Sequence, residues 1–355
     1  MEGILSWDNT IEAIVAQPGV VMDIGATDTG KTSFTMRLVN AGVAAGIPTA
    51  VVDADMGQSE IGPPTAISMA IVEKSVESLR SLRPRRMYFV GSTSPIGHLL
   101  PTVVGVKRMV DIAVARGAKL VVVDTSGLVA GILGRRLKLY KIDLVAPQHI
   151  VGIEREHEIE HILTALSGIE RYTLHRLKVS PEAQQKPPGY RIARRRSQFL
   201  DYLRNAERHI LRLDDIVCWG TLFTTGRPVK WQNYRFLERT LRTKVLHAEV
   251  VGKGMYIVAE CGAQMSGVGT LMEKYNTKDI TLVCGTDFTN ILVGLADANA
   301  NVLGLGIIEA IDFGQRHIAV LTPAKTTAPT RIVQFGSMRL SPDGIELGRI
   351  RPGEI

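Results

Sequence analysis

Gly25-Ala-Thr-Asp-Thr-Gly-Lys-Thr32 fits the pattern G-x-x-x-x-G-K-[ST] and lies between a predicted buried strand and a predicted helix. Its glycines allow successive backbone N–H groups to turn toward phosphate oxygens. The following helix adds unpaired N–H groups and the positive end of its dipole. The sequence therefore predicts a loop that holds a nucleoside triphosphate. Its residues are Gly25, Ala26, Thr27, Asp28, Thr29, Gly30, Lys31, Thr32 and Ser33.

Two side chains of this loop have expected roles in chemistry. The Lys31 ammonium is expected to reach the β and γ phosphates, and the Thr32 hydroxyl to be a ligand of Mg²⁺. An ordinary glycine turn before a helix is the alternative, but the strand-then-helix context disfavours it.

Short apolar runs alternate with helical patterns on both sides of the loop. Residues 20–24, 49–53 and 119–124 are rich in Val and Ile and unbroken by polar alternation, which is typical of strands buried on both faces of a parallel sheet. Residues 34–43 have helical spacing and end before Gly46, a predicted C-cap. The pattern predicts an α/β fold, a P-loop NTPase with a doubly wound, mainly parallel sheet.

The texture of the sequence changes twice toward its end. Residues 152–212 are charged and are predicted to form a surface helical insertion, of which 171–212 is an Arg-rich helical lid. From about residue 215, short β-rich runs are separated by turns, as at 297–301. We therefore expect a P-loop domain over 1–214 that includes the lid, and a C-terminal antiparallel β domain over 215–355.

The positive charge is local. The formal net charge is +7, yet residues 171–212 alone hold eleven Lys or Arg and three acids. This concentration predicts a polyanionic partner. Arg191 and Arg195 would share one face of a helix, and Arg194 and Arg196 would point elsewhere. The segment could close over a transferred phosphoryl group, follow a nucleic-acid backbone, or be a solvated basic face.

The three cysteines, Cys218, Cys261 and Cys284, lie far apart without a CxxC pair. This spacing argues against a zinc site and a disulfide framework, and fits a reducing cytoplasm. No apolar run approaches the ~20 residues that cross a bilayer, and no signal peptide is evident. We expect a cytoplasmic protein without membrane contact.

Carboxylates end two of the predicted strands. Asp53 ends the second run and Asp55 follows it, and Asp124 ends the third. Ligands of open α/β sheets bind outside the carboxyl ends of the strands, so these acids should face the phosphates. We predict metal ligands at Thr32, Asp53 and Asp124. A strand-end acid that caps the next turn is the alternative for each aspartate.

Together these motifs resemble the polynucleotide 5′-hydroxyl kinases of the RNA-processing type. That family includes the kinase subunit of messenger-RNA cleavage factor, ribosomal-RNA-processing kinases and their archaeal relatives. The resemblance spans most of the chain. It is carried by Gly25–Thr32, Asp53-Ala-Asp-Met-Gly-Gln58, Val90-Gly-Ser-Thr-Ser-Pro95, Asp124-Thr-Ser-Gly127, Arg191-x-x-x-Arg195, Leu292-Val-Gly-Leu-Ala-Asp297 and Val302-Leu-Gly-Leu-Gly-Ile-Ile308.

The resemblance implies an enzyme that uses ATP, or another nucleoside triphosphate, and Mg²⁺ to phosphorylate the 5′-hydroxyl end of RNA or DNA. It implies that Asp55 is the general base and that Lys31, Arg191 and Arg195 act on the transferred phosphoryl group. It also implies an acceptor-strand site. The residues expected there are Gln58, Thr93, Ser94, Arg194 and Arg196.

The chain departs from the family at two points. Leu128 stands where cleavage-factor-type relatives have a Trp that stacks on the terminal nucleotide, so base stacking there is lost. Only about eighteen residues precede the first predicted strand, whereas eukaryotic members carry an N-terminal β domain. This resemblance implies a minimal, archaeal-like form.

A scaffold subunit that binds ATP and nucleic acid without catalysis is the alternative function. The intact Lys31, Asp55 and arginine set favours the kinase. A GTPase switch would need an Asn-Lys-x-Asp motif, which the sequence lacks. Preference for RNA or DNA, strandedness, donor range, protein partners, oligomeric state and the role of the C-terminal domain stay open. Of its aromatic residues, Trp219, Trp231 and Tyr234 could stack bases, but we favour a core role.

Overall fold

The computed structural model describes residues 6–181, 183, 185–187, 189–325, 327–351 and 354–355. The chain forms two compact units, Met1–Gln198 and Phe199–Ile355. Their division falls inside helix α6 (Tyr190–Leu203), and the domain boundary expected after residue 214 stays a prediction. Within the described ranges, no helix has the length and apolar character needed to cross a bilayer.

The first unit is built on a seven-stranded sheet with the order β4-β3-β2-β5-β1-β6-β7. Strands β2, β5, β1, β6 and β7 are mutually parallel, and β3 pairs antiparallel with β2 and β4. The predicted doubly wound, mainly parallel fold is confirmed. The strands are β1 (Val20–Gly25), β2 (Thr49–Ala54), β3 (Ala66–Val72), β4 (Arg86–Phe89), β5 (Leu120–Thr125), β6 (His149–Glu154) and β7 (Thr173–Lys178).

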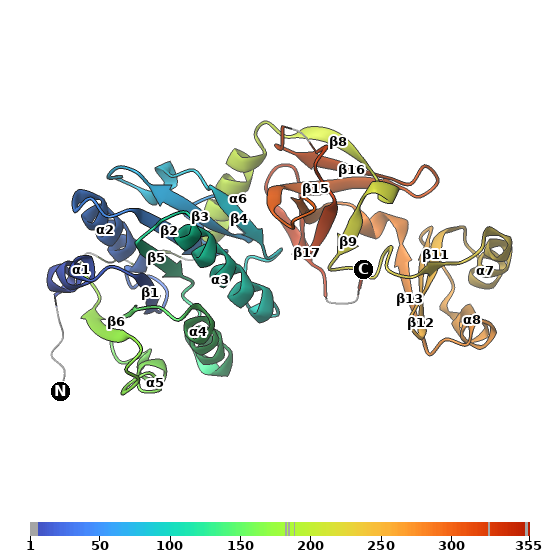
Figure 1. The fold of residues 1–355 in the computed structure, drawn as a ribbon. Helices are drawn as coiled ribbons and strands as arrows, with labels where there is room; N and C mark the ends of the chain where they lie inside the picture. Colours follow the sequence, from blue (N-terminus) through green and yellow to red (C-terminus); the bar gives the residue numbers. More distant parts are fainter. Residues whose placement is uncertain (1–5, 182, 184, 188, 326, 352–353) are drawn as a thin grey trace. The chain divides into compact units, whose positions relative to one another are not determined.

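Helices cover both faces of this sheet (Figure 1). Helices α1 and α2 contribute to one apolar core, and α3, α4 and α5 to the other. The covering elements are α1 (Trp7–Ala16), α2 (Lys31–Ala44), η1 (Leu79–Ser81), α3 (Leu99–Ala115), α4 (Gly131–Val145) and α5 (Glu160–Leu163).

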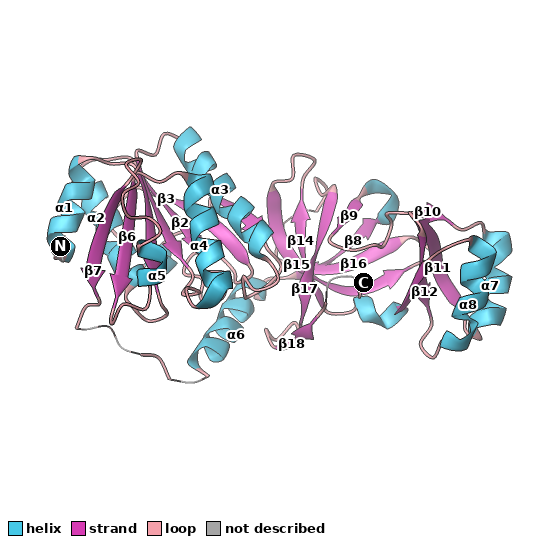
Figure 2. Cartoon of the chain, turned by 90° about the horizontal axis from the view of Figure 1, so that it is seen from below, coloured by secondary structure: helices cyan, strands magenta, loops and turns pink. Residues whose placement is uncertain are grey.

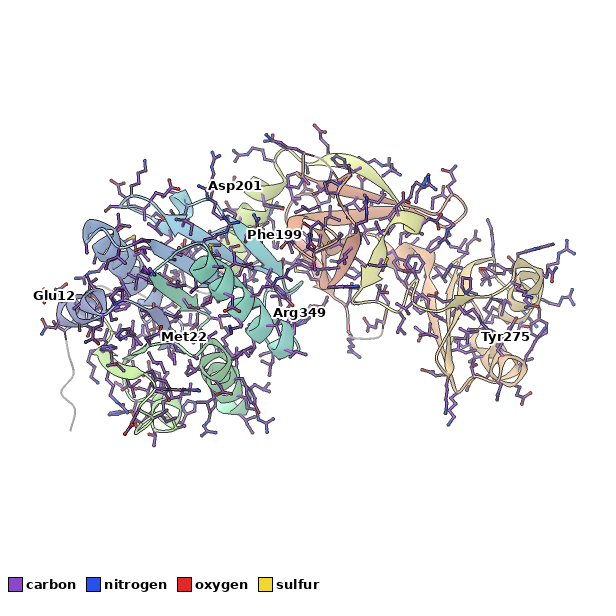
Figure 3. The ribbon with its side chains drawn as sticks, in the orientation of Figure 1. Glu12, Met22, Phe199, Asp201, Tyr275 and Arg349 are labelled. Carbon is purple, nitrogen blue, oxygen red and sulfur yellow. A yellow bond between two sulfur atoms is a disulfide. The ribbon has the colours of Figure 1, made fainter. Side chains whose placement is uncertain are left out.

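Strand alternation divides the side chains between these two cores. On β1, Met22 belongs to the core under α3 and α4, whereas Val21 belongs to the core under α1 and α2. Figure 3 shows Met22 inside the unit and Glu12 of α1 at its edge. The same alternation turns Asp23 toward α2, where its carboxylate accepts a hydrogen bond from the Thr35 hydroxyl at 2.6 Å.

The prediction of a helical insertion over 152–212 was partly wrong. Strand β7 pairs in parallel with β6 and extends the sheet, and β8 (Glu207–Arg212) pairs with β16. Among the described residues of this segment, only those of α5 and α6 are helical. As an edge strand, β7 is exposed at both ends and carries charged residues, so it lacks the continuous apolar run of a central strand.

The second unit contains the predicted antiparallel sheet, with the order β18-β17-β14-β15-β16-β8 (Figure 2). A short strand, β9, adds to β17 in parallel. The sequence predicted strands at 290–296, 302–309 and 317–321, and it did not locate the other strands of this sheet. Besides β8, the strands of the sheet are β9 (Val217–Trp219), β14 (Ile291–Ala296), β15 (Val302–Asp312), β16 (His317–Thr322), β17 (Ile332–Leu340) and β18 (Glu346–Arg349).

The prediction of one antiparallel domain was incomplete, because this unit holds a second sheet with the order β10-β11-β12-β13. Strands β12 and β13 pair in parallel, and two helices pack on the sheet. The elements are β10 (Arg227–Pro228), α7 (Tyr234–Leu241), β11 (Val245–Val251), β12 (Gly254–Ala259), α8 (Val268–Tyr275) and β13 (Asp279–Cys284). Short 3₁₀ turns are η2 (Leu213–Asp215), η3 (Trp231–Asn233), η4 (Met265–Gly267) and η5 (Gly285–Phe288).

Two expectations about single residues of this unit were wrong. A disulfide joins Cys261 to Cys284, whose Cα atoms are 5.0 Å apart, while Cys218 is free and buried. The parallel register of β12 and β13, with Ala259 beside Cys284, brings the two sulfurs together. The sequence separation of 23 residues could not show this. Trp219 and Trp231 are 48% and 79% exposed, so neither fills the core.

Candidate active site

A cavity of about 640 Å³ lies at the carboxyl ends of β1, β2 and β5 in the first unit. The phosphate loop forms its floor, and residues around the start of α6 complete its wall. Residues from five parts of the sequence line it. They are Trp7, Thr27, Asp28, Thr29, Gly30, Lys31, Thr32, Ser33, Arg37, Asp55, Gln58, Glu60, Asp124, Thr125, Gly127, Ser180, Ala183, Gln185, Lys186, Pro187, Tyr190, Arg191 and Arg194.

The phosphate loop has the geometry that its sequence predicts. Gly30 has φ of 88°, in the left-handed region that glycine tolerates best, and α2 begins at the next residue. The Lys31 Nζ donates to the Ala26 carbonyl at 2.6 Å, across the loop. Burial lowers the pKa of Lys31, and the surrounding carboxylates, Asp124 foremost, oppose this shift. Lys31 is therefore held at the phosphate loop, and carboxylates, Asp124 foremost, lie near its ammonium.

Thr32 and Asp124 meet beside the loop. The Thr32 Oγ1 donates to the Asp124 Oδ2 at 2.6 Å. Burial raises the pKa of Asp124 to about 6, while the Thr32 hydroxyl and the Lys31 ammonium act in the opposite direction. A hydroxyl and a carboxylate at the edge of a phosphate cradle are the oxygen ligands that Mg²⁺ prefers.

Asp53 lies close behind this pair but does not line the cavity. It is paired in register with Asp124 on the neighbouring strand. Its Oδ2 accepts hydrogen bonds from the Ser59 hydroxyl and from the backbone N–H groups of Glu60 and Ile61. Burial and the nearby Asp124 raise the pKa of Asp53 to about 8. These contacts favour the alternative of a strand-end acid that fixes the next loop, and its role as a metal ligand stays a prediction.

Asp55 does reach the cavity. Its Oδ1 accepts from the backbone N–H groups of Gly57 and Gln58, both at 3.1 Å, which fixes the carboxylate at the start of the turn. A Cβ on Gly57 would come within 2.5 Å of the Thr93 carbonyl oxygen, so this turn packs directly against the 91–94 loop. The side chain of Gln58 also lines the cavity.

The Gln58 amide connects this turn to α6. Its Nε2 donates to the Gly57 carbonyl at 2.5 Å and to the Arg191 carbonyl at 3.4 Å. Its Oε1 is buried and finds no partner among the described residues. An acceptor oxygen turned to the protein interior in this way is a candidate for a hydrogen bond from a ligand hydroxyl.

The arginines of α6 divide differently from the helical-face prediction. Arg191 and Arg194 line the cavity, whereas Arg195 and Arg196 do not. Arg191 donates to the Asp28 carboxylate at 3.0 Å and remains partly exposed. The guanidinium of Arg191 therefore already lies over the phosphate loop.

Arg194 is buried and tied to the loop after β2. Its guanidinium lies 2.5 Å from the Glu60 carboxylate and also donates to the Ser59 carbonyl at 3.3 Å. These contacts hold α6 against the loop that carries Asp55. Contact of Arg194 with an acceptor strand stays a prediction that its burial does not favour. The roles predicted for Thr93, Ser94, Arg195 and Arg196 stay predictions as well.

Sequence reasoning missed Arg155, which follows β6 and donates to the Thr27 and Asp28 carbonyls of the phosphate loop. A charged residue directly after an apolar strand was the available signal. It also missed Lys138 and Lys141 of α4, which are both fully buried. Lys138 donates to the Thr125 hydroxyl at 2.6 Å and to the Ser126 carbonyl, and so supports the loop after β5.

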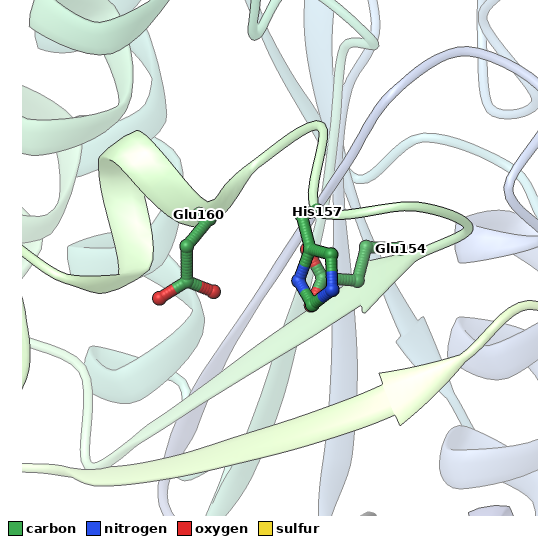
Figure 4. Close-up of side chains that lie close together, drawn as sticks. All are labelled: Glu154, His157 and Glu160. Carbon is green, nitrogen blue, oxygen red and sulfur yellow. The ribbon is translucent and has the colours of Figure 1, made fainter.

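Glu154, His157 and Glu160 gather at the end of β6, as Figure 4 shows. One ligand atom from each lies within 4.8 Å of the others. Arg176 donates to both Glu160 oxygens, at 2.5 and 3.1 Å, and holds the pKa of Glu160 down to about 2. The positive charge that balances the Glu160 carboxylate is therefore that of the Arg176 guanidinium.

Comparisons with known proteins agree with this geometry. The family model of the mRNA cleavage and polyadenylation factor CLP1 P-loop matches residues 25–205. A polyribonucleotide 5′-hydroxyl-kinase of Pyrococcus furiosus is 34% identical over 335 residues, which cover 94% of this chain and 90% of that protein. A polyribonucleotide 5′-hydroxyl-kinase of Methanocaldococcus jannaschii is 29% identical, with the same shares covered.

Among solved structures, a Clp1p–Pcf11p complex matches 93% of this chain and 77% of the matched chain, with a TM-score of 0.58. At 12% identity this likeness supports the fold alone. The residues matched by the family model include the phosphate loop, Asp55, Asp124 and the α6 arginines.

Proposed function

Because this chain belongs to the family of the mRNA cleavage and polyadenylation factor CLP1 P-loop, we propose that it is an ATP-dependent polynucleotide 5′-hydroxyl kinase. It would transfer the γ-phosphoryl group of ATP, or of another nucleoside triphosphate, to the 5′-hydroxyl end of RNA or DNA. The observation that carries the proposal is that Lys31, Asp55 and Arg191 line the same cavity. Donor-binding, acceptor-activating and charge-stabilising groups are thus within one site.

The donor half is the phosphate loop with Arg191. Phosphoryl transfer needs positive groups around the equatorial oxygens of the moving phosphoryl group more than it needs covalent chemistry. Lys31 would leave the Ala26 carbonyl for the β and γ phosphates, and Arg191 would leave Asp28. Both side chains already have an oxygen partner that a phosphate oxygen can replace. Arg195 would act from the next turn of α6.

The acceptor half is the turn after β2. Asp55 would accept the proton of the 5′-hydroxyl as that oxygen attacks the γ-phosphorus. Its Oδ1 is fixed by two backbone N–H groups, so the carboxylate is positioned before the acceptor arrives. Gln58 would hold the terminal nucleotide through its amide, and Thr93, Ser94, Arg194 and Arg196 would line the path of the strand.

A divalent cation fits beside this machinery. The Thr32 hydroxyl and the Asp124 carboxylate, 2.6 Å apart, would hold Mg²⁺ together with phosphate oxygens, with Asp53 on the neighbouring strand as the third predicted ligand. When bound, Mg²⁺ would neutralise charge on the β and γ phosphates.

We place the activity in the cytoplasm, where ATP and RNA are both available. The disulfide between Cys261 and Cys284 removes the argument from cysteine spacing for that compartment. A scaffold role without catalysis is the second candidate. It is disfavoured because the family motif residues and their contacts are intact.

End-labelling tests the proposal. The full chain would be incubated with γ-labelled ATP, Mg²⁺ and a 5′-hydroxyl oligoribonucleotide, beside a Lys31→Ala variant and a 5′-phosphorylated oligonucleotide of the same sequence. We expect label on the 5′-hydroxyl substrate only, and only with the wild-type chain. Label transfer by wild type no greater than by Lys31→Ala would reject the kinase and leave the scaffold role.

A further inference from the structure

The second unit carries an exposed, basic and aromatic surface on η3 and α7. Trp231 is 79% exposed, the most exposed of the large apolar side chains among the described residues. Arg235 and Arg239 are both exposed and share one face of α7, and Trp231 is exposed on η3, directly before the helix. The opposite face is anchored, because Leu237 and Leu241 are fully buried. We refer to Trp231, Arg235 and Arg239 as the α7 stripe.

The charge around the stripe is strongly positive. Between residues 227 and 244 there are six Lys or Arg and one acid, Glu238. Glu238, whose Oε1 accepts the backbone N–H of Val245 at 3.3 Å, leaves this segment with a net charge of +5. One of its cations, Lys244, pairs with Glu260 at 3.7 Å. In the part of the chain that the structure describes, no ion pair is formed by Arg235, Arg239 or Arg242. The cations are Arg227, Lys230, Arg235, Arg239, Arg242 and Lys244.

Helix α8 adds to this face. The Lys274 Nζ lies 3.4 Å from the centroid of the Phe236 ring, so a further ammonium is held against α7 by a cation–π contact. Figure 3 shows Tyr275, the last residue of α8, in this part of the unit. A face that combines positive charge with a solvent-exposed indole suits a partner that is both anionic and aromatic.

We propose that the α7 stripe is a second binding surface for single-stranded nucleic acid, separate from the catalytic cavity. An unpaired base would stack on the Trp231 indole, and backbone phosphates would receive the Arg235 and Arg239 guanidiniums. A duplex offers no free base face for stacking, which favours a single strand. An acidic protein segment would satisfy the arginines but not the indole. The proposal rests on the proposed function only in that both need a polynucleotide.

Equilibrium binding without ATP tests the surface separately from catalysis. A 3′-fluorescein-labelled 20-nucleotide RNA would be titrated with the full chain, and its anisotropy measured at 50 to 200 mM salt. The variant Arg235→Ala/Arg239→Ala removes two charges from the stripe. The matched control Lys325→Ala/Arg349→Ala removes two charges from exposed positions of the other sheet.

We expect the Arg235→Ala/Arg239→Ala variant to bind at least tenfold more weakly. We also expect its slope of log K against log salt to shrink by about 1.4, which corresponds to two phosphate contacts on a single strand. Trp231→Ala should weaken binding about tenfold through lost stacking, and Trp231→Phe should restore most of it. The control should bind within twofold of wild type.

Two results would overturn the proposal. One is binding by the Arg235→Ala/Arg239→Ala variant equal to that of the control, with the same salt slope. The other is preferred binding of a poly-glutamate peptide, which would assign the stripe to an acidic protein partner. A chain that binds RNA through the stripe but transfers no phosphate would keep this inference and reject the kinase.

Discussion

Asp53, Asp55 and Asp124 look alike in the sequence but have different surroundings in the structure. Each follows or ends an apolar strand, so the pattern could predict that they gather at one edge of the sheet. The pattern could not assign a separate role to each aspartate, because each role depends on the loop that the carboxylate contacts. Asp55 lines the cavity. Asp124 accepts a hydrogen bond from the Thr32 hydroxyl, and Asp53 accepts hydrogen bonds from the loop from Ser59 to Ile61.

Arg194 and Arg196 are close in sequence but should respond differently to replacement. Arg194→Ala removes one of the two guanidiniums that pair with Glu60, the other being that of Arg80, so we expect the unfolding free energy of the first unit to fall by about 2 kcal/mol. Arg196→Ala is exposed and should leave stability unchanged but reduce the salt slope of oligonucleotide binding by about 0.7. Thermal melting and salt titrations measure the two effects. Equal changes in melting temperature and in salt slope for the two variants would contradict this prediction.

Lys141 predicts a pH dependence of stability. It is fully buried, its Nζ finds no partner among the described residues, and burial lowers its pKa to about 8 from 10.5. Between pH 8 and 10.5 the unfolded chain therefore binds more protons, so the contribution of Lys141 to the unfolding free energy rises with pH across this window. Below pH 8 the full penalty remains, about 3 kcal/mol.

We expect Lys141→Met to stabilise the first unit at pH 7, with a gain over wild type that shrinks toward pH 10. Denaturant unfolding at several pH values measures it. Lys138→Met is the matched control, since Lys138 donates two hydrogen bonds and its loss should destabilise the unit. Equal destabilisation by both substitutions at pH 7 would show that Lys141 has a partner.

At the scale of elements, the site depends on the turn between β2 and β3 packing against the loop after β4. Apolar periodicity predicted the strands well, because strands buried on both faces have few competing patterns. It could not predict that Gly57 lies against the Thr93 backbone, since this contact joins two irregular loops. Nor could it show that Arg194, but not Arg195, lines the cavity, because Arg194 is held there by contacts with Glu60 and Ser59.

Gly57→Ala tests this contact. The added Cβ would lie 2.5 Å from the Thr93 carbonyl oxygen, so the turn that fixes Asp55 must shift. We expect turnover of the 5′-hydroxyl acceptor to fall about 10²-fold, while ATP binding stays within twofold. Steady-state kinetics and nucleotide titration separate these effects. Gly269→Ala, which adds a Cβ in open space, is the control, and an equal loss there would contradict the prediction.

At the scale of the whole molecule, the sequence predicted the first unit more completely than the second. The P-loop pattern fixes a strand, a turn and a helix at once, and the buried runs fix the parallel sheet. Strands of the second unit such as β13 and β17 are only partly buried and lack continuous apolar runs, so its division into two sheets was not visible. The disulfide and the exposed Trp231 both belong to the part of the unit that contains the smaller sheet.

The phosphate loop and Asp55 line one cavity, and we propose that they bind the nucleotide and activate the acceptor there. Single-turnover phosphoryl transfer by Asp55→Asn, compared with wild type on a 5′-hydroxyl oligoribonucleotide, tests it most directly. We expect phosphoryl transfer by Asp55→Asn to fall by about 10²- to 10⁴-fold, with ATP affinity unchanged, because the general base is lost and the phosphate loop is intact. Transfer by Asp55→Asn at the wild-type rate would contradict it.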